Sequence, residues 1–448
     1  MPERTSWTEA EAEQRLRSLE LFGMRFGLDR MRRMMTALDS PERRFDSIQV
    51  LGTNGKSSTT RMTAAILAGH GLRIGAYTSP HLVSYRERVL IDGRELDSEE
   101  FAGTVARASH AAEQVDRTLG EDDHVTQFEL LTAAAFAAMA EREVEIAVIE
   151  AGLGGRYDAT SVIDAPIVVL TNVGLEHTRW LGPTVRDIAE EKLAVVRSGG
   201  TLVLGEWLAG EAREAMVLAR RIASERGARI VTVREEPSTT ELAARGSFQR
   251  RNFALARAAA AEYLRDPVHG RGIPLDERAV EVAARDTLVP GRLQIVAERP
   301  LIVFDGAHNP AAVDALAASL PELVGDRAVA LVLGVLEDKD AASMLGGLLR
   351  LCERAWFTAP PSPRALSPAA LQSLARQLSF AAVESEPRPE RALRAAMAWA
   401  CERPEQRAVL ATGSIYLVGD LLAELEPANP ARSADPTQSS GKLNTVKA

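Results

Sequence analysis

The stretch "LGTNGKSSTT", residues 51–60, resembles a phosphate-binding loop, but one that is shorter than usual. Gly52 lies four residues before Lys56, whereas the Walker A pattern G-x-x-x-x-G-K-[ST] would place its first glycine at Val50. The preceding residues 45–52 have the apolar, β-branched character of a buried strand, and residues 57–71 have helical spacing. A glycine turn between strand and helix directs free backbone N–H groups toward a phosphate. The stretch therefore predicts a nucleotide site, and a purely structural turn is the alternative.

Lysine is rare in this chain, which makes its few positions informative. Of the 53 Lys and Arg residues only five are lysines, at Lys56, Lys192, Lys339, Lys442 and Lys447. The lysine ammonium is a compact point charge that can lose its proton, whereas the guanidinium is a planar fork that stays charged. The retained lysines are therefore candidates for functions that Arg cannot perform; the alternative is retention by chance. Lys56 falls in the suspected phosphate loop, which favours the functional interpretation.

Composition excludes several classes of protein. A chain of 448 residues with 46% hydrophobic and 26% charged residues is ordinary for a globular protein of two or more domains. Its net charge of −9 argues against broad nucleic-acid binding, although local pockets for small anions remain possible. Cys352 and Cys401 form neither a disulfide framework nor a metal-ligand spacing. The charged N-terminus has no signal-peptide region, and no apolar run approaches the ~18 residues of a membrane span. We expect a cytoplasmic monomer without nucleic-acid or membrane partners.

Strand-like and helix-like segments alternate along the chain, which predicts an α/β fold. Helical segments such as 99–115 separate strands expected at 45–51, 73–78, 144–150, 166–171, 201–204, 229–233, 301–305, 328–335, 355–358 and 408–412. This alternation predicts a mostly parallel sheet with helices on both faces. Pro and Gly residues in 284–300 precede a new strand–turn–helix series. We therefore expect a large ATP-binding domain at 1–290, a smaller Rossmann-like α/β domain at 291–428, and a disordered tail at 429–448.

Polar side chains follow successive predicted strands. Ser79 follows 73–78, Glu150 ends 144–150, His177 follows 166–171, and Lys192 lies in the next helical segment. A lone His or Glu is more often structural, but ligands of open parallel sheets bind at the carboxyl ends of strands. Together with Lys56 and Ser57/Ser58, these groups form a set of hard oxygens and imidazole suited to Mg²⁺ beside phosphate.

Several motifs occur together in an order that is specific. They are GTNGK, TSPHL followed by ERV (87–89), EAGLGGRYDAT (150–160), TNVGLEHT (171–178), EEK (190–192), PGRLQ (290–294), DGAHNP (305–310) and GSIYLVGD (413–420). In this order they resemble the dihydrofolate synthase/folylpolyglutamate synthase branch of the Mur-ligase superfamily. The resemblance extends from about residue 20 to residue 425. It implies a two-domain ligase, with a large P-loop-type domain and a smaller Rossmann-like domain, that holds ATP between them.

The resemblance also implies roles for individual residues. The ATP phosphates would lie on Gly52, Thr53, Asn54, Gly55, Lys56, Ser57 and Ser58. One Mg²⁺ would be held by Ser79 and Glu150, and a second by His177 with a CO₂-derived carbamate on Lys192. Asn252 would contact adenine, Arg292 and Asp305 would reach ATP from the second domain, and the amino-acid side would be lined by His308, Ser414 and Tyr416. The pterin substrate would lie near Met24, Arg25, Phe26, Thr126, Gln127, Phe128, Glu129, Tyr157, Asp158 and Ala159.

The chain departs from the family pattern in four places. Ser57 replaces a flexible loop glycine, Glu176 stands where Asp is common, Ser161 replaces Asn, and residues 22–28 differ from the form associated with dihydropteroate binding. None of these departures touches a proposed metal ligand. They bear on pterin specificity rather than on ligase chemistry.

The implied reaction is ATP-dependent amide formation. A carboxylate is a poor acyl donor, so ATP would first phosphorylate it, with Lys56 and two Mg²⁺ offsetting the charge of the γ-phosphoryl group. The α-amino group of L-glutamate would then attack the acyl phosphate of dihydropteroate or a folate. His308 and Asp305 could orient or deprotonate that amine, although helix capping by Asn309 also explains their segment. For Lys339 in "GVLEDKD" the main interpretation is a local ion pair, with a ligand role as the alternative.

Two other functions fit parts of the sequence. A Mur ligase that builds cell-wall peptide would have a UDP-sugar-binding domain of about 100 residues before the ATP loop, whereas only 51 residues precede Gly52. A nucleotide-binding regulator without ligase chemistry would need neither the motifs at 290–310 nor Lys192. Phosphate release that requires both a pteroyl acceptor and glutamate would separate a folate ligase from both.

Overall fold

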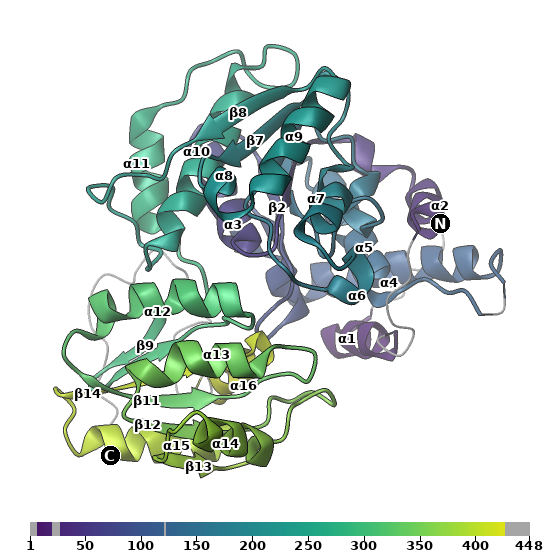
Figure 1. The fold of residues 1–448 in the computed structure, drawn as a ribbon. Coiled ribbons are helices and arrows are strands. Elements are labelled where there is room, and N and C mark those ends of the chain that lie inside the picture. Colours follow the sequence, from purple (N-terminus) through teal and green to yellow (C-terminus); the bar gives the residue numbers. More distant parts are fainter. Residues whose placement is uncertain (1–6, 20–26, 121, 426–448) are drawn as a thin grey trace.

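The computed structural model describes residues 7–19, 27–120 and 122–425, which form two α/β units (Figure 1). The proposed pterin contacts Met24, Arg25 and Phe26, and the tail expected at 429–448, lie outside the described residues. The predicted fold class is confirmed, with one large and one smaller sheet, each covered by helices. In Figure 1 the second unit, green to yellow, lies below the first.

The first sheet has eight strands in the order β4-β3-β2-β5-β1-β6-β7-β8. Their bounds are β1 Asp46–Leu51, β2 Ile74–Tyr77, β3 Val89–Ile91, β4 Arg94–Glu95, β5 Ile146–Glu150, β6 Ile167–Leu170, β7 Thr201–Gly205 and β8 Arg229–Val233. Only β3 and β4, at one edge, run antiparallel to their neighbours. The central strands are apolar almost throughout because helices bury both faces of the sheet.

Helices pack on both faces of this sheet. Their bounds are α1 Glu9–Ser18, α2 Asp29–Ala37, α3 Lys56–Ala68, α4 Ser98–Asp116, α5 Gln127–Glu141, α6 Thr178–Leu181, α7 Val185–Leu193, α8 Leu208–Glu211, α9 Arg213–Glu225, α10 Phe248–Arg265 and α11 Glu277–Asp286. Apolar residues of α3, α10 and α11 form one core with Ile48 and Val50 of β1. The opposite face is covered by α4 and α5 around Ile149 and by α7 and α9 around Leu51. The alternation of side chains along each strand thus supplies both cores.

The second unit is a six-stranded sheet in the order β13-β12-β11-β14-β10-β9, antiparallel only at β9. Its elements are β9 Gln294–Glu298, β10 Leu301–Phe304, α12 Pro310–Val324, β11 Ala328–Leu333, α13 Ala341–Leu348, β12 Arg354–Phe357, α14 Pro368–Gln377, β13 Val383–Ser385, α15 Pro389–Cys401, β14 Arg407–Thr412 and α16 Ile415–Leu425. Because α11 ends at Asp286 and β9 begins at Gln294, we keep 291 as the proposed start of a second domain.

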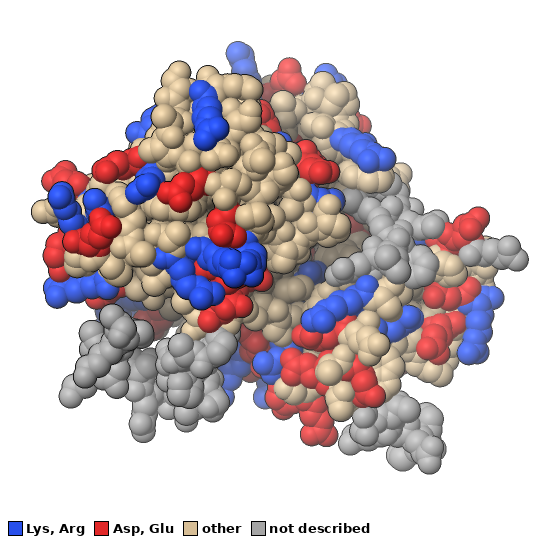
Figure 2. All heavy atoms as spheres, turned by 90° about the horizontal axis from the view of Figure 1, so that it is seen from below, with Lys and Arg blue, Asp and Glu red and all other residues tan. Residues whose placement is uncertain are grey.

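The surface carries both charge signs close together. Figure 2 shows Lys and Arg side chains interspersed with Asp and Glu over the described part of one face. Many charged side chains of the described residues are paired, as in Arg251 with Glu211 and Glu235, or Arg257 with Glu236 and Glu277. Within the described ranges, the helices include none with the length and apolar character to cross a membrane.

Candidate functional site

The phosphate loop is held in shape by residues at the end of the neighbouring strand β6. Gly52 and Gly55 have φ of +151° and +82°, backbone conformations that favour glycine. The Thr171 hydroxyl donates to Asn54 O at 2.7 Å, and Asn172 Oδ1 accepts from the N–H groups of Thr53 (3.1 Å) and Asn54 (2.9 Å). The loop is therefore preformed, although it is shorter than a Walker A loop.

The start of α3 suits an anion. Lys56 is the first residue of this helix, and the Gly55 position before it provides no side-chain cap for the first N–H groups. Such groups, with the positive end of the helix dipole, bind phosphate readily. Lys56 Nζ donates to Thr53 O at 3.0 Å, which folds its charge over the loop, and Ser58 is buried at the base of the helix.

Ser57, Ser79 and Glu150 meet as predicted from their strand ends. Ser57 Oγ donates to Glu150 Oε1 and the Ser79 N–H donates to Glu150 Oε2, both at 3.0 Å. Burial raises the pKa of Glu150, against the opposing charge of Lys56. A desolvated carboxylate that contacts the Ser57 hydroxyl, with Ser79 beside it, fits a hard cation such as Mg²⁺, so the donor chemistry of this cluster is appropriate for a metal.

A small pocket beside the loop gathers the second set of predicted groups. It is lined by Gly52, Thr53, Lys56, Gly152, Leu153, Glu176, His177, Leu181 and Lys192. Lys192 is only 5% exposed, and its Nζ donates to Gly52 O at 2.9 Å. Burial and the charge of Lys56 lower the pKa of Lys192 to about 7. An unmodified ammonium cannot bind a cation, so His177 and Lys192 fit a second metal only if Lys192 carries a carbamate.

The described residues include no group of three or more His, Cys, Asp or Glu side chains that could hold a metal ion by themselves. Any cation at this edge would therefore need ligands of other kinds, such as the Ser57 and Ser79 hydroxyls and nucleotide phosphates.

Asn252 lies against the phosphate loop. A Cβ on Gly55 would lie 2.3 Å from Asn252 Oδ1, so glycine is required for this close approach. Asn252 Nδ2 donates to Gln249 Oε1 at 2.8 Å, while the fully buried Gln249 Nε2 has no hydrogen-bond partner. Asn252 is thus near the predicted nucleotide, and Gln249 is a polar neighbour that the sequence did not single out.

The second domain contributes Arg292, Asp305 and His308 to this region. Asp305 accepts backbone N–H bonds from Leu293 and Ala307, both at 2.8 Å, and so ties the PGRLQ and DGAHNP segments together. Burial raises the pKa of Asp305, against the charge of Arg292. Arg292 also lies near enough to act electrostatically on Glu150 of the first domain.

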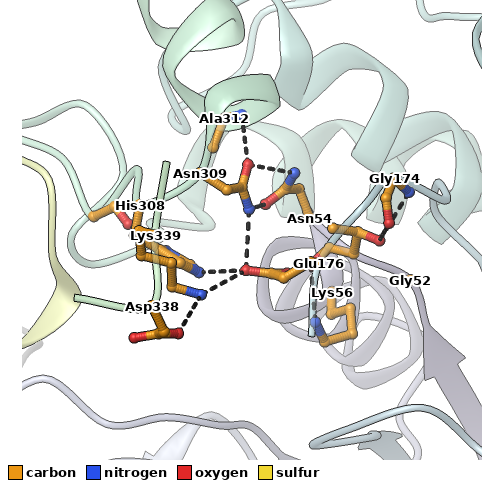
Figure 3. A network of polar contacts seen from close by, with 12 residues as sticks. Gly52, Asn54, Lys56, Gly174, Glu176, His308, Asn309, Ala312, Asp338 and Lys339 are labelled. Atoms are coloured by element: carbon orange, nitrogen blue, oxygen red, sulfur yellow. Dashed lines mark hydrogen bonds and ion pairs between the residues drawn. The ribbon is translucent and has the colours of Figure 1, made fainter. Parts of the chain in front are cut away.

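Glu176 connects the two domains, as Figure 3 shows. Its Oε1 lies 3.1 Å from His308 Nε2, 3.2 Å from Asn309 Nδ2 and 3.3 Å from Lys339 Nζ. His308 Nδ1 lies 2.9 Å from Gly306 O, so both ring nitrogens face oxygen acceptors. The predicted capping by Asn309 is present, since its Oδ1 accepts from Ala312 N at 2.8 Å. Lys339 has the predicted local pair with Asp338 at 3.5 Å and also this longer-range partner.

Some of the residues predicted for the pterin side are used in hydrogen bonds within the fold. Thr126 and Glu129 form a capping box at the start of α5, and Glu129 is also paired with the buried Arg30 at 3.1 Å. Asp158 is buried and accepts from the N–H groups of Leu153 (2.7 Å) and Thr160 (3.0 Å).

The other residues of this set differ in burial and in contacts. The Phe128 ring packs against Gly152, Gln127 Nε2 donates to Leu16 O at 3.0 Å, Ala159 is buried and Tyr157 is 47% exposed. Of the described candidates, Phe128 and Tyr157 are best placed to meet a ligand.

Ser414 and Tyr416 lie at the start of α16. Gly413 N donates to Ala307 O at 3.1 Å, so this turn lies beside the DGAHNP segment. Ser414 is 1% exposed and accepts from Tyr416 N at 3.2 Å, whereas the Tyr416 side chain is 41% exposed. Tyr416 is therefore the more accessible of the two.

Sequence reasoning gave Asn172 no role, noted Glu176 only as a departure from the family pattern, and expected only a local ion pair for Lys339. Asn172 directly follows a predicted strand, which is the signal that identified Ser79 and Glu150. Glu176 and Lys339 are 163 residues apart, and no local pattern pairs them.

Two protein-family models match this chain. The Mur ligase middle domain matches residues 50–204, and the Mur ligase glutamate ligase domain matches residues 291–415. The first match contains the phosphate loop, Glu150, His177 and Lys192, and the second contains Arg292, Asp305 and His308.

Curated proteins and solved structures are similar over most of the chain. The dihydrofolate synthase/folylpolyglutamate synthase of Escherichia coli is 31% identical over 84% of this chain and 86% of its own length. A probable bifunctional folylpolyglutamate synthase/dihydropteroate synthase of Haloferax volcanii is 33% identical over 92% of this chain, which spans 50% of that longer protein.

Among solved structures, Mycobacterium tuberculosis folylpolyglutamate synthase with ADP and AMPPCP has a TM-score of 0.84 and 29% identity, covering 93% of this chain and 98% of that chain. The bifunctional Yersinia pestis enzyme with AMPPNP and a Mn ion has a TM-score of 0.77 and 29% identity, covering 95% and 100%.

Proposed function

The chain belongs to the dihydrofolate synthase/folylpolyglutamate synthase family, and from this we infer that it is an ATP-dependent ligase that joins L-glutamate to a folate substrate. Its co-substrate is ATP. The observation that carries this proposal is the position of the second domain, whose DGAHNP loop contacts the phosphate loop through Asn309 and Asn54 (3.0 Å). A ligase needs such an arrangement because ATP and the amino group of glutamate must both reach the carboxylate of the folate substrate.

We propose that Lys56 and the N–H groups at the start of α3 hold the ATP phosphates. The acceptor carboxylate attacks the γ-phosphorus, releasing ADP and forming an acyl phosphate. The α-amino group of glutamate then attacks the acyl carbon, releasing phosphate and forming the amide. Placing these steps between two domains keeps water from hydrolysing the acyl phosphate.

Asp305 and His308 are proposed to help position the incoming amine. Both lie on the segment that faces the phosphate loop, but both already have hydrogen-bond partners in the second or first domain. Both nitrogens of His308 face oxygen acceptors, so for His308 orientation of the amine is a better supported role than proton removal. Each oxygen of Asp305 accepts one backbone N–H bond and keeps a lone pair for the amine.

Two Mg²⁺ ions are also proposed. Ser79 and Glu150 would hold one, with the Ser57 hydroxyl beside Glu150, and His177 with a carbamate on Lys192 would hold the other. Bound Mg²⁺ would offset the negative charge that accumulates on the transferred phosphoryl group. The Mn ion in the similar Yersinia pestis structure supports a divalent cation as part of the nucleotide complex.

Neither alternative function is favoured. The match to a glutamate ligase domain at 291–415 is not expected of a nucleotide-binding regulator, and the similar proteins bear folate rather than cell-wall names. Monomeric state and cytoplasmic location remain proposals from composition; light scattering on the purified protein tests the first.

We expect both dihydropteroate and tetrahydrofolate to be glutamylated. The proposal rests on the family assignment and on the positions of Phe128, which packs against Gly152, and of the exposed Tyr157. Purified protein with ATP, Mg²⁺ and glutamate is offered each acceptor, and products are measured by mass spectrometry. If only tetrahydrofolate gave a product, the protein would lack dihydrofolate synthase activity. Phosphate release without any acceptor would contradict ligase function altogether.

Substitution Arg292→Ala should raise the KM for ATP by about tenfold or more with little change in folding. Arg292 acts electrostatically on Glu150 and Asp305, and a charge-assisted hydrogen bond is worth roughly 1.5–3 kcal/mol. The matched control is Arg299→Ala, since the Arg299 side chain is 79% exposed and forms an ion pair with the surface residue Glu405 at 3.4 Å. Equal KM values for the two variants would assign Arg292 a structural role.

A further inference from the structure

A single carboxylate oxygen of the first domain collects three donors of the second. Glu176 Oε1 faces His308 and Asn309, which follow β10, and Lys339, which follows β11, all within 3.3 Å. Figure 3 shows these donors converging on Glu176 from one side. The loop that carries Glu176 thus meets the carboxyl-end edge of the second sheet.

Burial shields the ion pair of Glu176 with Lys339 from solvent. The side chains of Glu176 and Lys339 are only 9% and 10% exposed, whereas Asp338, the other partner of Lys339, is 42% exposed. A desolvated ion pair is screened less by water and salt than an exposed one. Loss of one partner leaves an uncompensated buried charge, which is strongly unfavourable. Lys339 therefore depends on Glu176 more than on its local neighbour.

The same network reaches the catalytic groups. Asn309 exchanges two amide hydrogen bonds with Asn54 of the phosphate loop, at 3.0 and 3.3 Å. Glu176 directly precedes His177, and both line the pocket that contains Lys56 and Lys192. A shift of the second domain would therefore move the loops on both sides of the pocket together.

The other contacts between the domains include one polar pair, in which Ser247 N and Oγ each lie 3.1 Å from Ser319 Oγ, and apolar contacts. Leu82 packs against the core around α16, and Phe248 packs against the core around α12 and α13. Apolar contacts of this kind favour association but tolerate sliding. A bond network with defined distances selects one arrangement.

We propose that Glu176 is a positioning residue that locks the second domain over the phosphate loop by holding Lys339, His308 and Asn309. The role in catalysis rests on the proposed ligase function, whereas the docking itself is a property of the free protein. The length of the side chain matters: Asp at this position would be one methylene, or about 1.5 Å, shorter. It could not reach all three donors without movement of the loop.

The experiment measures the distance between the domains in the full chain. Val217 of α9 is 61% exposed, and Cys401 of α15 is an exposed native thiol, so Val217→Cys creates a labelling pair with one substitution. Burial raises the pKa of Cys352 to about 12, which keeps that thiol from reacting with the labels. Spin labels then report the interdomain distance distribution without any ligand.

In this background we expect Glu176→Gln and Lys339→Met to broaden the distribution and shift it to longer distances, with Glu176→Asp intermediate. The kcat/KM for ATP should fall by about tenfold or more in each single variant. The double variant Glu176→Gln/Lys339→Met should have a kcat/KM no lower than that of the less active single variant, because both substitutions break the same contact. Asp338→Asn, which removes the local partner of Lys339, should match the unsubstituted protein in both measurements.

The outcomes separate the lock from the ligase assignment. The lock would be overturned if Glu176→Gln and Lys339→Met left the distance distributions unchanged. It would also be overturned if the loss of kcat/KM in the double variant equalled the product of the two single losses. In either case, ligation by the unsubstituted protein would still support the proposed function. Altered distributions in a protein that never ligates glutamate would support the lock and contradict the proposed function.

Discussion

The Lys192→Arg variant should lose nearly all ligation activity although it keeps the positive charge. Lys192 is buried, and its Nζ contacts Gly52 O of the phosphate loop at 2.9 Å. A carbamate requires an amine that can lose a proton and capture CO₂, which Lys can do and Arg cannot. The resulting carboxylate would turn a cation into an anion beside His177 and complete a metal-ligand set there. The measurement is ATP-dependent incorporation of labelled glutamate.

Two further observations distinguish a carbamate from a steric requirement for lysine. Lys192→Ala should be partly rescued by a small carboxylic acid such as acetate, whereas Lys56→Ala should not, because Lys56 is proposed to supply charge rather than a carboxylate. Protein equilibrated with ¹³C-bicarbonate should show a carbamate signal that is absent from Lys192→Arg. A fully active Lys192→Arg enzyme would exclude the carbamate.

The second large effect is expected from Gly52→Ala, which should abolish use of ATP. A Cβ at this position would lie 1.8 Å from Thr171 Oγ1, the hydroxyl that holds Asn54 O. The φ of +151° is itself unfavourable for alanine, by roughly 1–3 kcal/mol. The chain can relieve the overlap only by moving the phosphate loop or the end of β6, and either movement disturbs the backbone N–H groups that receive phosphate.

Gly93→Ala is the matched control for this prediction. Gly93 has a φ of +77° in the turn between β3 and β4, but a Cβ there would meet nothing within 4 Å. It should therefore show backbone strain alone, with a lower melting temperature and nearly unchanged nucleotide affinity. If isothermal titration with a non-hydrolysable ATP analogue gave the two variants equal affinities, the close approach at Gly52 would be irrelevant to nucleotide binding.

Most of the strands that sequence analysis found have two covered faces. All ten predicted strands correspond to elements of the two sheets, and all except the partly exposed edge strand β8 are largely buried, because a strand buried on both sides reads as a continuous apolar run. The four that it missed, β3, β4, β9 and β13, lie at or next to sheet edges. They are short or carry polar residues, as in "RE" at β4 and "VES" at β13, so their sequences contain little periodic signal. β9 was not predicted because Pro290 and Gly291, shortly before it, indicate a loop.

The same distinction holds for the site. The meeting of Ser57, Ser79 and Glu150 was predictable, since each follows or begins beside a parallel strand, and strand ends of one sheet share an edge. The capping use of the Glu129 carboxylate can be read from the T-x-x-E pattern of residues 126–129. The pairing of Glu129 with Arg30 and the turn N–H groups that occupy Asp158 were not predictable, because no motif reveals them.

By itself, then, the sequence determined the α/β class, the phosphate loop and the edge of the first sheet where the polar groups gather. Periodicity and strand order are local properties, and they suffice for these features. Only the tertiary structure decided that Glu176 pairs with Lys339 and that Asn54 meets Asn309. These contacts join residues 163 and 255 positions apart across two separately formed sheets. Their geometry depends on how the second domain docks, and docking depends on contacts between residues far apart in the chain, such as the partly buried Leu82 and Phe248 and the network at Glu176, rather than on any local pattern.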